Sequence, residues 1–320
     1  MTAPDEALER LAAALRAAGT TLGKGHGAGN DFLILVDPDG RFEVTAEQVV
    51  AVTDRRAGIG ADGLIRALPS SLGSEGAVAL ASEARAQWFV DYRNADGSVA
   101  QTCGNGLRVL VEFLSRRGLV PDSPGSEVVV GTRAGTVTVR REPDGLVADL
   151  GRWWFPGGVE ATDAGYDVGV AVAGLAGLRP GLRVAVANPH TVVAVADRAE
   201  LERADLSRPP LTDPVAPAGT NVELVVPLGE RVERGERVGL LAMRVHERGV
   251  GETRSCGSGA CAAALAVRAW AGGAAPDRWE VSAPGGDLRV RVLPEQRVEL
   301  GGCLLYTSPE PTRHDSGSRM

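Results

Sequence analysis

The sequence contains the same series of short segments twice, and this internal repeat constrains the fold more than any other feature. The segment Gly29–Phe32 precedes an apolar run, and its counterpart Ala187–His190 does the same, with Asn30 and Asn188 lying 158 positions apart. Cys103-Gly-Asn-Gly returns as Cys256-Gly-Ser-Gly, 153 positions later. Because these landmarks recur in the same order at a nearly constant offset, we predict two copies of one α/β unit.

Secondary-structure signals recur with the landmarks. Each Cys-Gly-x-Gly segment precedes an apolar-periodic stretch that predicts a helix, and each stretch ends at a glycine, Gly118 or Gly272, typical of a C-terminal cap. Further on, SEVVVGTRAGTVTVR and WEVSAPGGDLRVRV both predict strand–turn–strand units. We place the boundary between the copies near Gly151–Gly157. Two similar halves form an interface with an approximate two-fold axis, where ligand sites are common.

Composition excludes several classes of function. The 320 residues suffice for two domains, and the net charge of −7 disfavours binding to nucleic acid or to an anionic membrane. No apolar run reaches the roughly 18 residues of a membrane span. The N-terminal segment lacks the pattern of a signal peptide and predicts a short amphipathic helix. We therefore expect a cytoplasmic protein.

The cysteines and the single lysine narrow the chemistry. Four cysteines are too few for a disulfide scaffold, and with no C-x-x-C and only four histidines the sequence does not predict a structural zinc site. Cys261 is interpreted as a small core residue on a helix. Lys24, the only lysine, lies near the N-terminus, which argues against a Schiff-base racemase.

Cys103 and Cys256 each stand immediately before a glycine-rich turn that opens a predicted helix. The first N–H groups of a helix have no internal partner, and with the helix dipole they create a positive site. We expect this site to stabilise the thiolate and lower the pKa of each thiol. The glycines leave the N–H groups uncovered, so that a substrate carboxylate can bind there as well.

Two thiols at one site suggest inversion of a carbon centre. One thiolate removes a proton from one face, a thiol delivers a proton to the other, and N–H donors at two helix starts stabilise the charge that develops on the carboxylate. For either motif alone, a buried cysteine in a tight turn is an equal interpretation. The occurrence of both motifs at equivalent places in the two halves favours chemistry.

The sequence resembles the diaminopimelate epimerase family from about residue 22 to residue 302. The long motifs around Cys103 and Cys256 are highly specific, whereas GNDF or NPH alone is weak. The matching segments are Lys24–Phe32, Gly58–Gly63, Asn94–Ser98, Cys103–Arg108, Asn188–His190, Gly219–Glu223, Glu247–Thr253 and Cys256–Cys261.

The resemblance implies an α/β fold of two pseudo-symmetric domains, each a β-sheet wrapped around a central helix, with the site in the cleft between them. It implies interconversion of LL- and meso-diaminopimelate for lysine and cell-wall precursor biosynthesis, without metal or organic cofactor, by a homodimer. We expect an N-terminal extension over 1–20, domains over 21–153 and 154–302, and a divergent tail over 303–320. This tail is polar and predicts disorder, and it suggests that one strand of the second domain is truncated.

Site residues follow from the resemblance position by position. Cys103 and Cys256 match the catalytic cysteines, and His190 and Glu247 match groups that support catalysis. The matching substrate-binding positions are Asn30, Asn94, Gly104, Asn105, Asn188, Asn221, Glu247, Arg248, Gly257 and Ser258. Arg248 suits a bidentate carboxylate contact, whereas each asparagine has a turn or cap as its structural alternative.

Three further positions are given no role in the site. Gly63 stands where some family members carry a glutamine that contacts substrate. Ser255 replaces a common alanine, and we expect little effect from it. Glu223 is interpreted as a strand residue that faces solvent.

Other functions stay open at this point. A proline or hydroxyproline racemase of the same fold also uses two cysteines, although its local motifs differ. A same-fold isomerase of the phenazine-pathway type does not require paired cysteines. From other classes, Cys103 and Cys256 could cycle through a disulfide in a thiol redox or sensing protein, or the chain could be an inactive binding protein.

Overall fold

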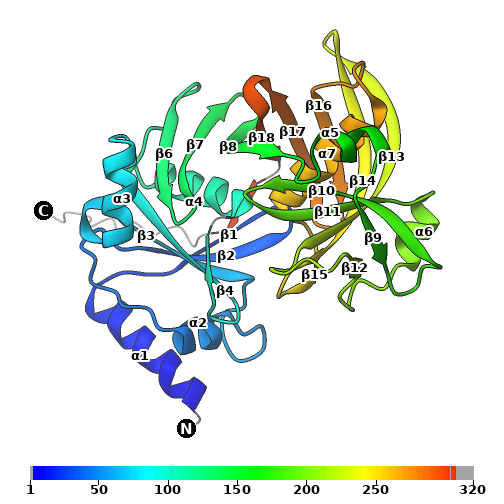
Figure 1. The fold of residues 1–320 in the computed structure, drawn as a ribbon. Coiled ribbons are helices and arrows are strands. Elements are labelled where there is room, and N and C mark those ends of the chain that lie inside the picture. The colour runs from blue at the N-terminus through cyan, green and yellow to red at the C-terminus, as the bar shows by residue number, and fades with distance from the viewer. Residues whose placement is uncertain (1–2, 102, 303, 308–320) are drawn as a thin grey trace, which may run out of the picture.

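The computed structural model describes residues 3–101, 103–302 and 304–307. Two bodies of strands lie side by side, and each surrounds one long helix, α4 in the first half and α7 in the second (Figure 1). The predicted α/β fold with two pseudo-symmetric halves is confirmed. The domain boundary between 153 and 154 stays a prediction.

The first half follows an N-terminal helix, α1 (Ala3–Ala17). Its elements are β1 (Gly23–Gly27), β2 (Asn30–Val36), α2 (Ala46–Thr53), β3 (Gly63–Pro69), a 3₁₀ turn η1 (Ser70–Leu72), α3 (Ser74–Ser82), β4 (Trp88–Asn94), β5 (Val99–Ala100), α4 (Gly104–Arg116), β6 (Glu127–Thr132), β7 (Gly135–Glu142) and β8 (Gly145–Trp154).

The second half begins after β8 and ends with the last described strand. Its elements are α5 (Gly158–Ala164), β9 (Val168–Ala171), β10 (Leu178–Val186), β11 (Asn188–Ala194), α6 (Arg198–Arg203), β12 (Leu211–Asp213), β13 (Asn221–Glu233), β14 (Glu236–Glu247), β15 (Gly251–Thr253), α7 (Gly257–Ala271), β16 (Arg278–Ala283), β17 (Gly286–Leu293), η2 (Pro294–Gln296), β18 (Arg297–Gly302) and β19 (Leu304–Thr307).

The sequence repeat is a structural repeat. Strands β2 and β11 begin at the matched residues Asn30 and Asn188, and each runs parallel to the next long strand of its half, β3 or β13. Helices α4 and α7 begin one residue after Cys103 and Cys256. The repeat therefore places the two cysteines at equivalent points of equivalent units.

The two central helices are buried by different means. Helix α4 fills its half with large side chains such as Leu110 and Phe113, both fully buried. Helix α7 is rich in buried alanine, and the small side chains let the surrounding strands approach it closely. Cys261 is fully buried among the alanines of α7, so its predicted place in the core is confirmed.

The halves exchange strands where they meet. The end of β8 leaves the first half and pairs with β10, with Trp154 opposite Ala185. Strand β18 pairs with β8, and β19 crosses back to pair with β1. The expectation of disorder from residue 303 is therefore wrong for 304–307, because β1 offers an edge whose backbone groups this segment satisfies. Residues 308–320, the rest of the expected tail, lie outside the described residues.

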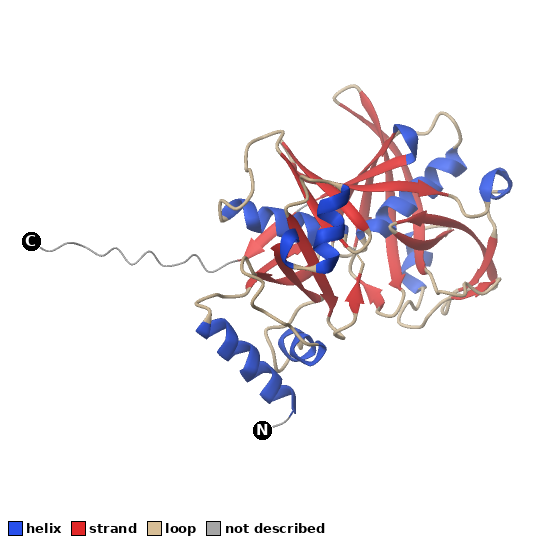
Figure 2. Ribbon diagram, turned by 60° about the vertical axis from the view of Figure 1, so that its left-hand side comes forward, coloured by secondary structure: helices blue, strands red, loops and turns tan. Residues whose placement is uncertain are grey.

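The N-terminal extension is the expected amphipathic helix. Helix α1 buries Ala7 and Leu11, and Leu11 packs with Val49 and Val52 of α2, while its charged residues face outward. It lies on the outside of the first half (Figure 2). No helix within the described ranges is long and apolar enough to cross a membrane.

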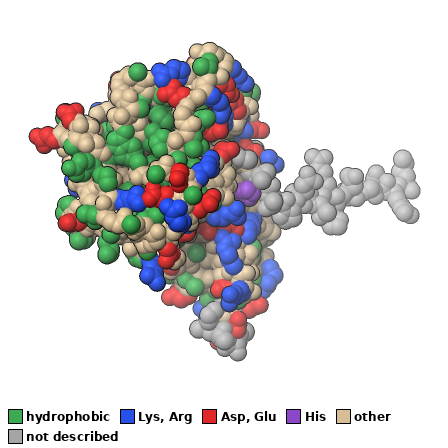
Figure 3. Space-filling view, turned by 90° about the vertical axis from the view of Figure 1, so that its right-hand side faces the viewer, with side chains coloured by type: hydrophobic (Ala, Val, Ile, Leu, Met, Phe, Trp, Pro, Cys, Tyr) green, Lys and Arg blue, Asp and Glu red, His purple; other side chains and the backbone are tan. Residues whose placement is uncertain are grey.

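Charge is distributed over the surface in both signs. Figure 3, which faces the second half, shows acidic and basic side chains interspersed around an apolar area. Many of these charges are paired, as in the exposed contact of 2.7 Å between Arg231 and Glu280. The net charge of −7 is therefore not gathered on this face.

A buried hydrogen-bond network joins the halves at the helix starts. The Asn105 amide donates to Asn30 Oδ1 (2.7 Å) and to Ser255 Oγ (3.2 Å), and the Ser255 hydroxyl donates to the Ala28 carbonyl (2.6 Å). Arg108 donates to Asn105 Oδ1 (2.7 Å). Ser255 is fully buried. The sequence-based view of Ser255 as a neutral replacement overlooked this position, because its partners lie about 150 or more residues away in the chain.

We expect Ser255→Ala to lower the free energy of unfolding by about 1–3 kcal/mol, because it leaves the buried Ala28 carbonyl without this donor. Urea denaturation of the variant and the parent protein measures the change. Ser123→Ala, at an exposed position, is the control and should change stability by less than about 0.5 kcal/mol. A Ser255→Ala value equal to that of the control contradicts the role of this network.

Candidate active site

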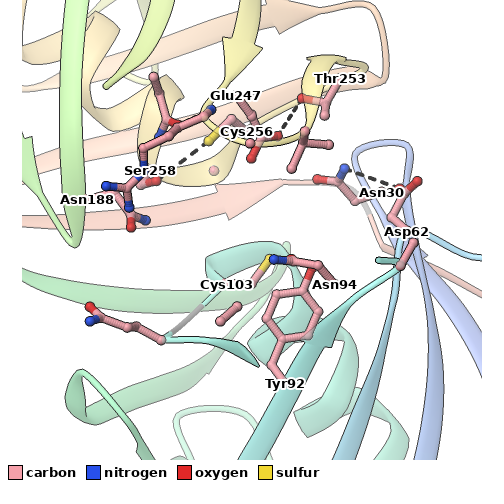
Figure 4. Close-up of a pocket in the computed structure, with 18 of the residues that line it drawn as sticks. Asn30, Asp62, Tyr92, Asn94, Cys103, Asn188, Glu247, Thr253, Cys256 and Ser258 are labelled. Carbon is pink, nitrogen blue, oxygen red and sulfur yellow. Dashed lines mark hydrogen bonds between the residues drawn. The ribbon is translucent and has the colours of Figure 1, made fainter. Parts of the chain in front are cut away.

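A cavity of about 520 Å³ lies between the halves and is lined from both sides. Figure 4 shows Cys103 and Cys256 on opposite sides of it. Of the positions predicted from the sequence, the cavity is lined by Asn30, Asn94, Cys103, Gly104, Asn188, Asn221, Glu247, Arg248, Cys256, Gly257 and Ser258. The fold thus gathers positions that are spread over more than 220 residues of sequence.

Tight turns deliver Asn30 and Asn188 to the cavity. The residues before them, Gly29 and Ala187, have φ of 84° and 55°. Such a φ suits glycine but is uncommon for alanine, which adopts it only where the surroundings impose it. Here the antiparallel pairing of β10 with β11, with Val186 opposite Asn188, imposes the turn.

Each thiol caps the helix that follows it. The Gly106 N–H points to Cys103 Sγ, and the Gly259 N–H points to Cys256 Sγ, both at 3.4 Å. The Ser258 hydroxyl lies 3.6 Å from Cys256 Sγ. Both sulfurs therefore sit at the positive ends of helices, as the glycine-rich motifs predicted.

The expected lowering of the thiol pKa is wrong for the protein without substrate. Burial raises the pKa of Cys103 to about 11, the Glu247 carboxylate adds to the rise, and the Gly106 N–H opposes it without outweighing burial. Burial, followed by the carboxylates of Glu247 and Glu223, raises the pKa of Cys256 well above its ordinary value. Loss of water and nearby negative charge thus exceed the effect of the helix starts, and they favour the protonated form of both thiols in the protein without substrate.

The end of β14 supplies charged groups to the cavity. Burial raises the pKa of Glu247, while a hydrogen bond from the Thr253 hydroxyl opposes the shift. The backbone N–H of Arg248 donates to Asn221 Oδ1 (2.8 Å), and its guanidinium donates to the Ala218 carbonyl (2.7 Å). Within the described part of the chain, no carboxylate pairs with Arg248, so its charge is available to a bound anion.

Two predicted positions lie behind the cavity wall. Asn105 is fully buried, and its side chain is occupied by Asn30, Ser255 and Arg108. Only its backbone N–H reaches toward Cys103. His190 is buried beside Glu223, with Nδ1 2.7 Å from Glu223 Oε1. Neither the Asn105 side chain nor the His190 side chain lines the cavity, so any role of these two side chains in catalysis is indirect.

Asp62, Tyr92 and Glu223 are among the residues of this region to which the sequence interpretation gave no role. Asp62 and Tyr92 line the cavity. The Tyr92 ring occupies space that Gly63 leaves open, since a Cβ at Gly63 would lie 2.7 Å from Tyr92 Cε2. Glu223 was expected to face solvent but is fully buried. Asp62 and Glu223 each lie inside a segment that matches the family, Gly58–Gly63 and Gly219–Glu223, whereas no sequence signal marks Tyr92.

The site is thus built from thiols, amides, carboxylates and backbone N–H groups. Among the described residues, no group of three or more His, Cys, Asp or Glu side chains is arranged to hold a metal ion. Cys103, Cys256 and Cys261 are free thiols. This arrangement can bind a carboxylate between two helix starts and present one thiol to each face of it.

Solved structures with a similar fold include a phenazine biosynthesis protein of the PhzF family from Bacillus anthracis and a hydroxyproline epimerase from Agrobacterium vitis. Their TM-scores are 0.58 and 0.55, each at 16% identity. They cover 90% of this chain and 96% and 90% of their own chains. At this identity the likeness shows the shared fold alone.

Sequence comparisons are more specific. The family model described as diaminopimelate epimerase matches residues 22–153 and 183–304. The diaminopimelate epimerase of Thermobifida fusca is 43% identical, covering 91% of this chain and 97% of the relative. That of Streptomyces coelicolor is 41% identical, covering 87% and 90%. With most of its length matched by the family model and by these relatives, the chain belongs to the diaminopimelate epimerase family.

Proposed function

We propose that this protein is a cofactor-independent isomerase that interconverts LL- and meso-diaminopimelate, a reaction of lysine biosynthesis. Membership of the family supports the substrate. The observation that carries the mechanism is the pair of helix-capping thiols on opposite sides of one cavity.

Cys103 and Cys256 act as a two-base pair in this proposal. One thiolate takes the α-proton, so that a C–H bond breaks and an S–H bond forms. The thiol on the opposite face gives its proton to the same carbon, and the configuration inverts. For the reverse reaction the two sulfurs exchange roles.

The helix starts hold the reacting carboxylate. When the α-proton leaves, negative charge moves onto this group, and backbone N–H donors at Gly104, Asn105, Gly257 and Ser258 are placed to stabilise it. The glycines let the two helix starts pack closely beneath the cavity, since a Cβ at Gly104 or Gly257 would lie 2.9 or 2.5 Å from Leu300 Cδ2.

The other polar residues of the cavity would bind the second amino-acid centre of the substrate, which does not react. Arg248, which pairs with no carboxylate in the described chain, would bind the distal carboxylate, and Glu247 the distal ammonium. Asn30, Asn94, Asn188 and Asn221 would complete the polar lining. His190 would support catalysis from behind the wall.

Two further expectations belong to this proposal. Catalysis by thiols requires that they stay reduced, which fits the cytoplasmic location expected from the sequence. The homodimer implied by the family resemblance stays a prediction.

We expect Cys103→Ala and Cys256→Ala each to lower the epimerisation rate by at least about 10²–10⁴-fold, because each removes one proton carrier. Incubation of the reduced protein with LL-diaminopimelate in deuterated water, followed by proton NMR, measures both isotope entry at the α-carbon and the meso product. Cys261→Ala, a core position outside the cavity, should keep full activity.

Near-normal turnover in Cys103→Ala or in Cys256→Ala would contradict the two-thiol mechanism. Absence of α-exchange in the parent protein, with thiols that oxidise readily to a disulfide, would favour a redox protein instead.

We expect Arg248→Met to raise KM for diaminopimelate by about 10- to 100-fold with a smaller change in kcat, because a charge-assisted hydrogen bond distant from the reacting carbon contributes about 1.5–3 kcal/mol. Steady-state kinetics in both directions measures this. The control is Arg254→Met, an exposed arginine that donates to the Pro284 carbonyl. Equal KM values for the two variants contradict the distal-carboxylate assignment.

A further inference from the structure

The residues packed beneath the two thiol-bearing helix turns differ in chemistry, although the two helices are equivalent in the repeat. In the first half, apolar side chains lie beneath the first turn of α4: a Cβ at Gly106 would lie 2.9 Å from Ile65 Cδ1 and 3.5 Å from Phe32 Cε1. In the second half, a Cβ at Gly259 would lie 2.6 Å from Glu223 Oε1. A carboxylate therefore approaches the turn that carries Cys256, where a hydrocarbon approaches the turn that carries Cys103.

The structural repeat makes this comparison position by position. In the first half Phe32 is opposite Gly63 and Ile34 is opposite Ile65 on the parallel strands β2 and β3. In the second half His190 is opposite Asn221 and Val192 is opposite Glu223 on β11 and β13. The pair Phe32 and Ile65 thus corresponds to the pair His190 and Glu223, at the same offset of 158 that relates Asn30 to Asn188.

Burial of the His190–Glu223 pair costs folding free energy. His190 and Glu223 are both fully buried, and beyond their 2.7 Å contact, His190 Nε2 and Glu223 Oε2 have no hydrogen-bond partner in the described chain. Burying such groups with incomplete partners costs free energy, whereas two apolar side chains fill the equivalent place in the first half. Packing alone does not explain the pair, which points to an effect on the adjacent thiol.

We propose that Glu223 is a positioning residue that makes the two thiols unequal, by placing a carboxylate beside the first turn of α7 where it opposes ionisation of Cys256. This deepens the proposed function and rests on it. As the pH of the substrate-free protein is raised, Cys103 is then the first thiol to lose its proton, and Cys256 the second. In the direction of reaction that begins with the thiolate on Cys103, Cys103 is the base and Cys256 the proton donor; the reverse direction begins with the opposite arrangement.

The other charged groups around the thiols agree with this order. Glu247, at the end of β14, raises the pKa of both thiols, whereas Glu223 is a cause of the shift for Cys256 alone. Glu223 on β13 raises the pKa of Cys256, and Arg108 on α4 lowers that of Cys103. His190 on β11 is the partner of Glu223, and Asp62 and Tyr92 face the cavity from the first half.

Alkylation of each thiol as a function of pH tests the proposal without any substrate. The reduced protein is treated with iodoacetamide in short pulses between about pH 8 and 12, and peptide mass spectrometry gives separate rates for Cys103 and Cys256, since only the thiolate reacts. We expect the Cys103 midpoint at the lower pH. Midpoints are compared rather than absolute rates, because Cys256 is the more buried thiol.

Glu223→Gln keeps the shape of the side chain and an acceptor for His190 but removes the negative charge. Below both midpoints, we expect Cys256 to react about tenfold faster in this variant, which corresponds to one pKa unit, while Cys103 changes by less than about twofold. Glu252→Gln, an exposed glutamate on β15 paired with Arg244, should change neither rate.

Several outcomes overturn the proposal. Coincident or reversed midpoints in the parent protein do so without any variant, even if Glu223→Gln fails to fold. A variant that only lowers Tm, or that shifts both thiols equally, assigns Glu223 a merely structural role. Because diaminopimelate is absent from the assay, failure here is distinct from failure of the epimerase assignment.

Discussion

The structure depends on one close contact: the starts of α4 and α7 meet at the interface between the halves. Gly104 and Gly257 have no side chains there, so the same Leu300 side chain packs against both helix starts. Asn105, from the second residue of α4, bonds across the interface to Ser255, which precedes α7. These groups are buried, and pulling the halves apart would leave them unpaired. The contact therefore holds the two thiols at a fixed separation.

Within that frame, the environment of each sulfur is a balance of opposed effects. The helix-start N–H groups favour negative charge, while burial and the carboxylates of Glu247 and Glu223 disfavour it, and the latter prevail in the protein without substrate. In the proposed reaction, the first N–H groups of the two helices hold the reacting carboxylate of the substrate. The helix starts are thus better suited to charge that develops on substrate than to charge stored on sulfur.

The features that the two halves share and the features in which they differ have separate consequences for the cavity. The repeated frame gives two thiols, two glycine-rich helix starts and two asparagines at strand starts. The differences between the halves make the two sides of the cavity chemically unlike. For example, β4 ends at Asn94, whereas β14 ends at Glu247. A symmetric cavity would treat both thiols alike, whereas this one is lined by two carboxylates from the first half, Asp62 and Asp96, and by the oppositely charged Glu247 and Arg248 from the second.

The sequence by itself determined the two-copy fold, the helices after Cys103 and Cys256, and most residues of the cavity, because repeats and glycine-rich turns are local patterns. It could not determine what depends on packing across the interface. Glu223 and Tyr92 look like ordinary strand residues until β13 and β4 are folded against their helices. The segment 304–307 shows no strand pattern, yet it pairs with β1 because that edge is free to receive it. The thiol pKa values were misjudged for the same reason: the helix start is visible in the sequence, but the burial and the carboxylates that outweigh it arise only in the tertiary structure.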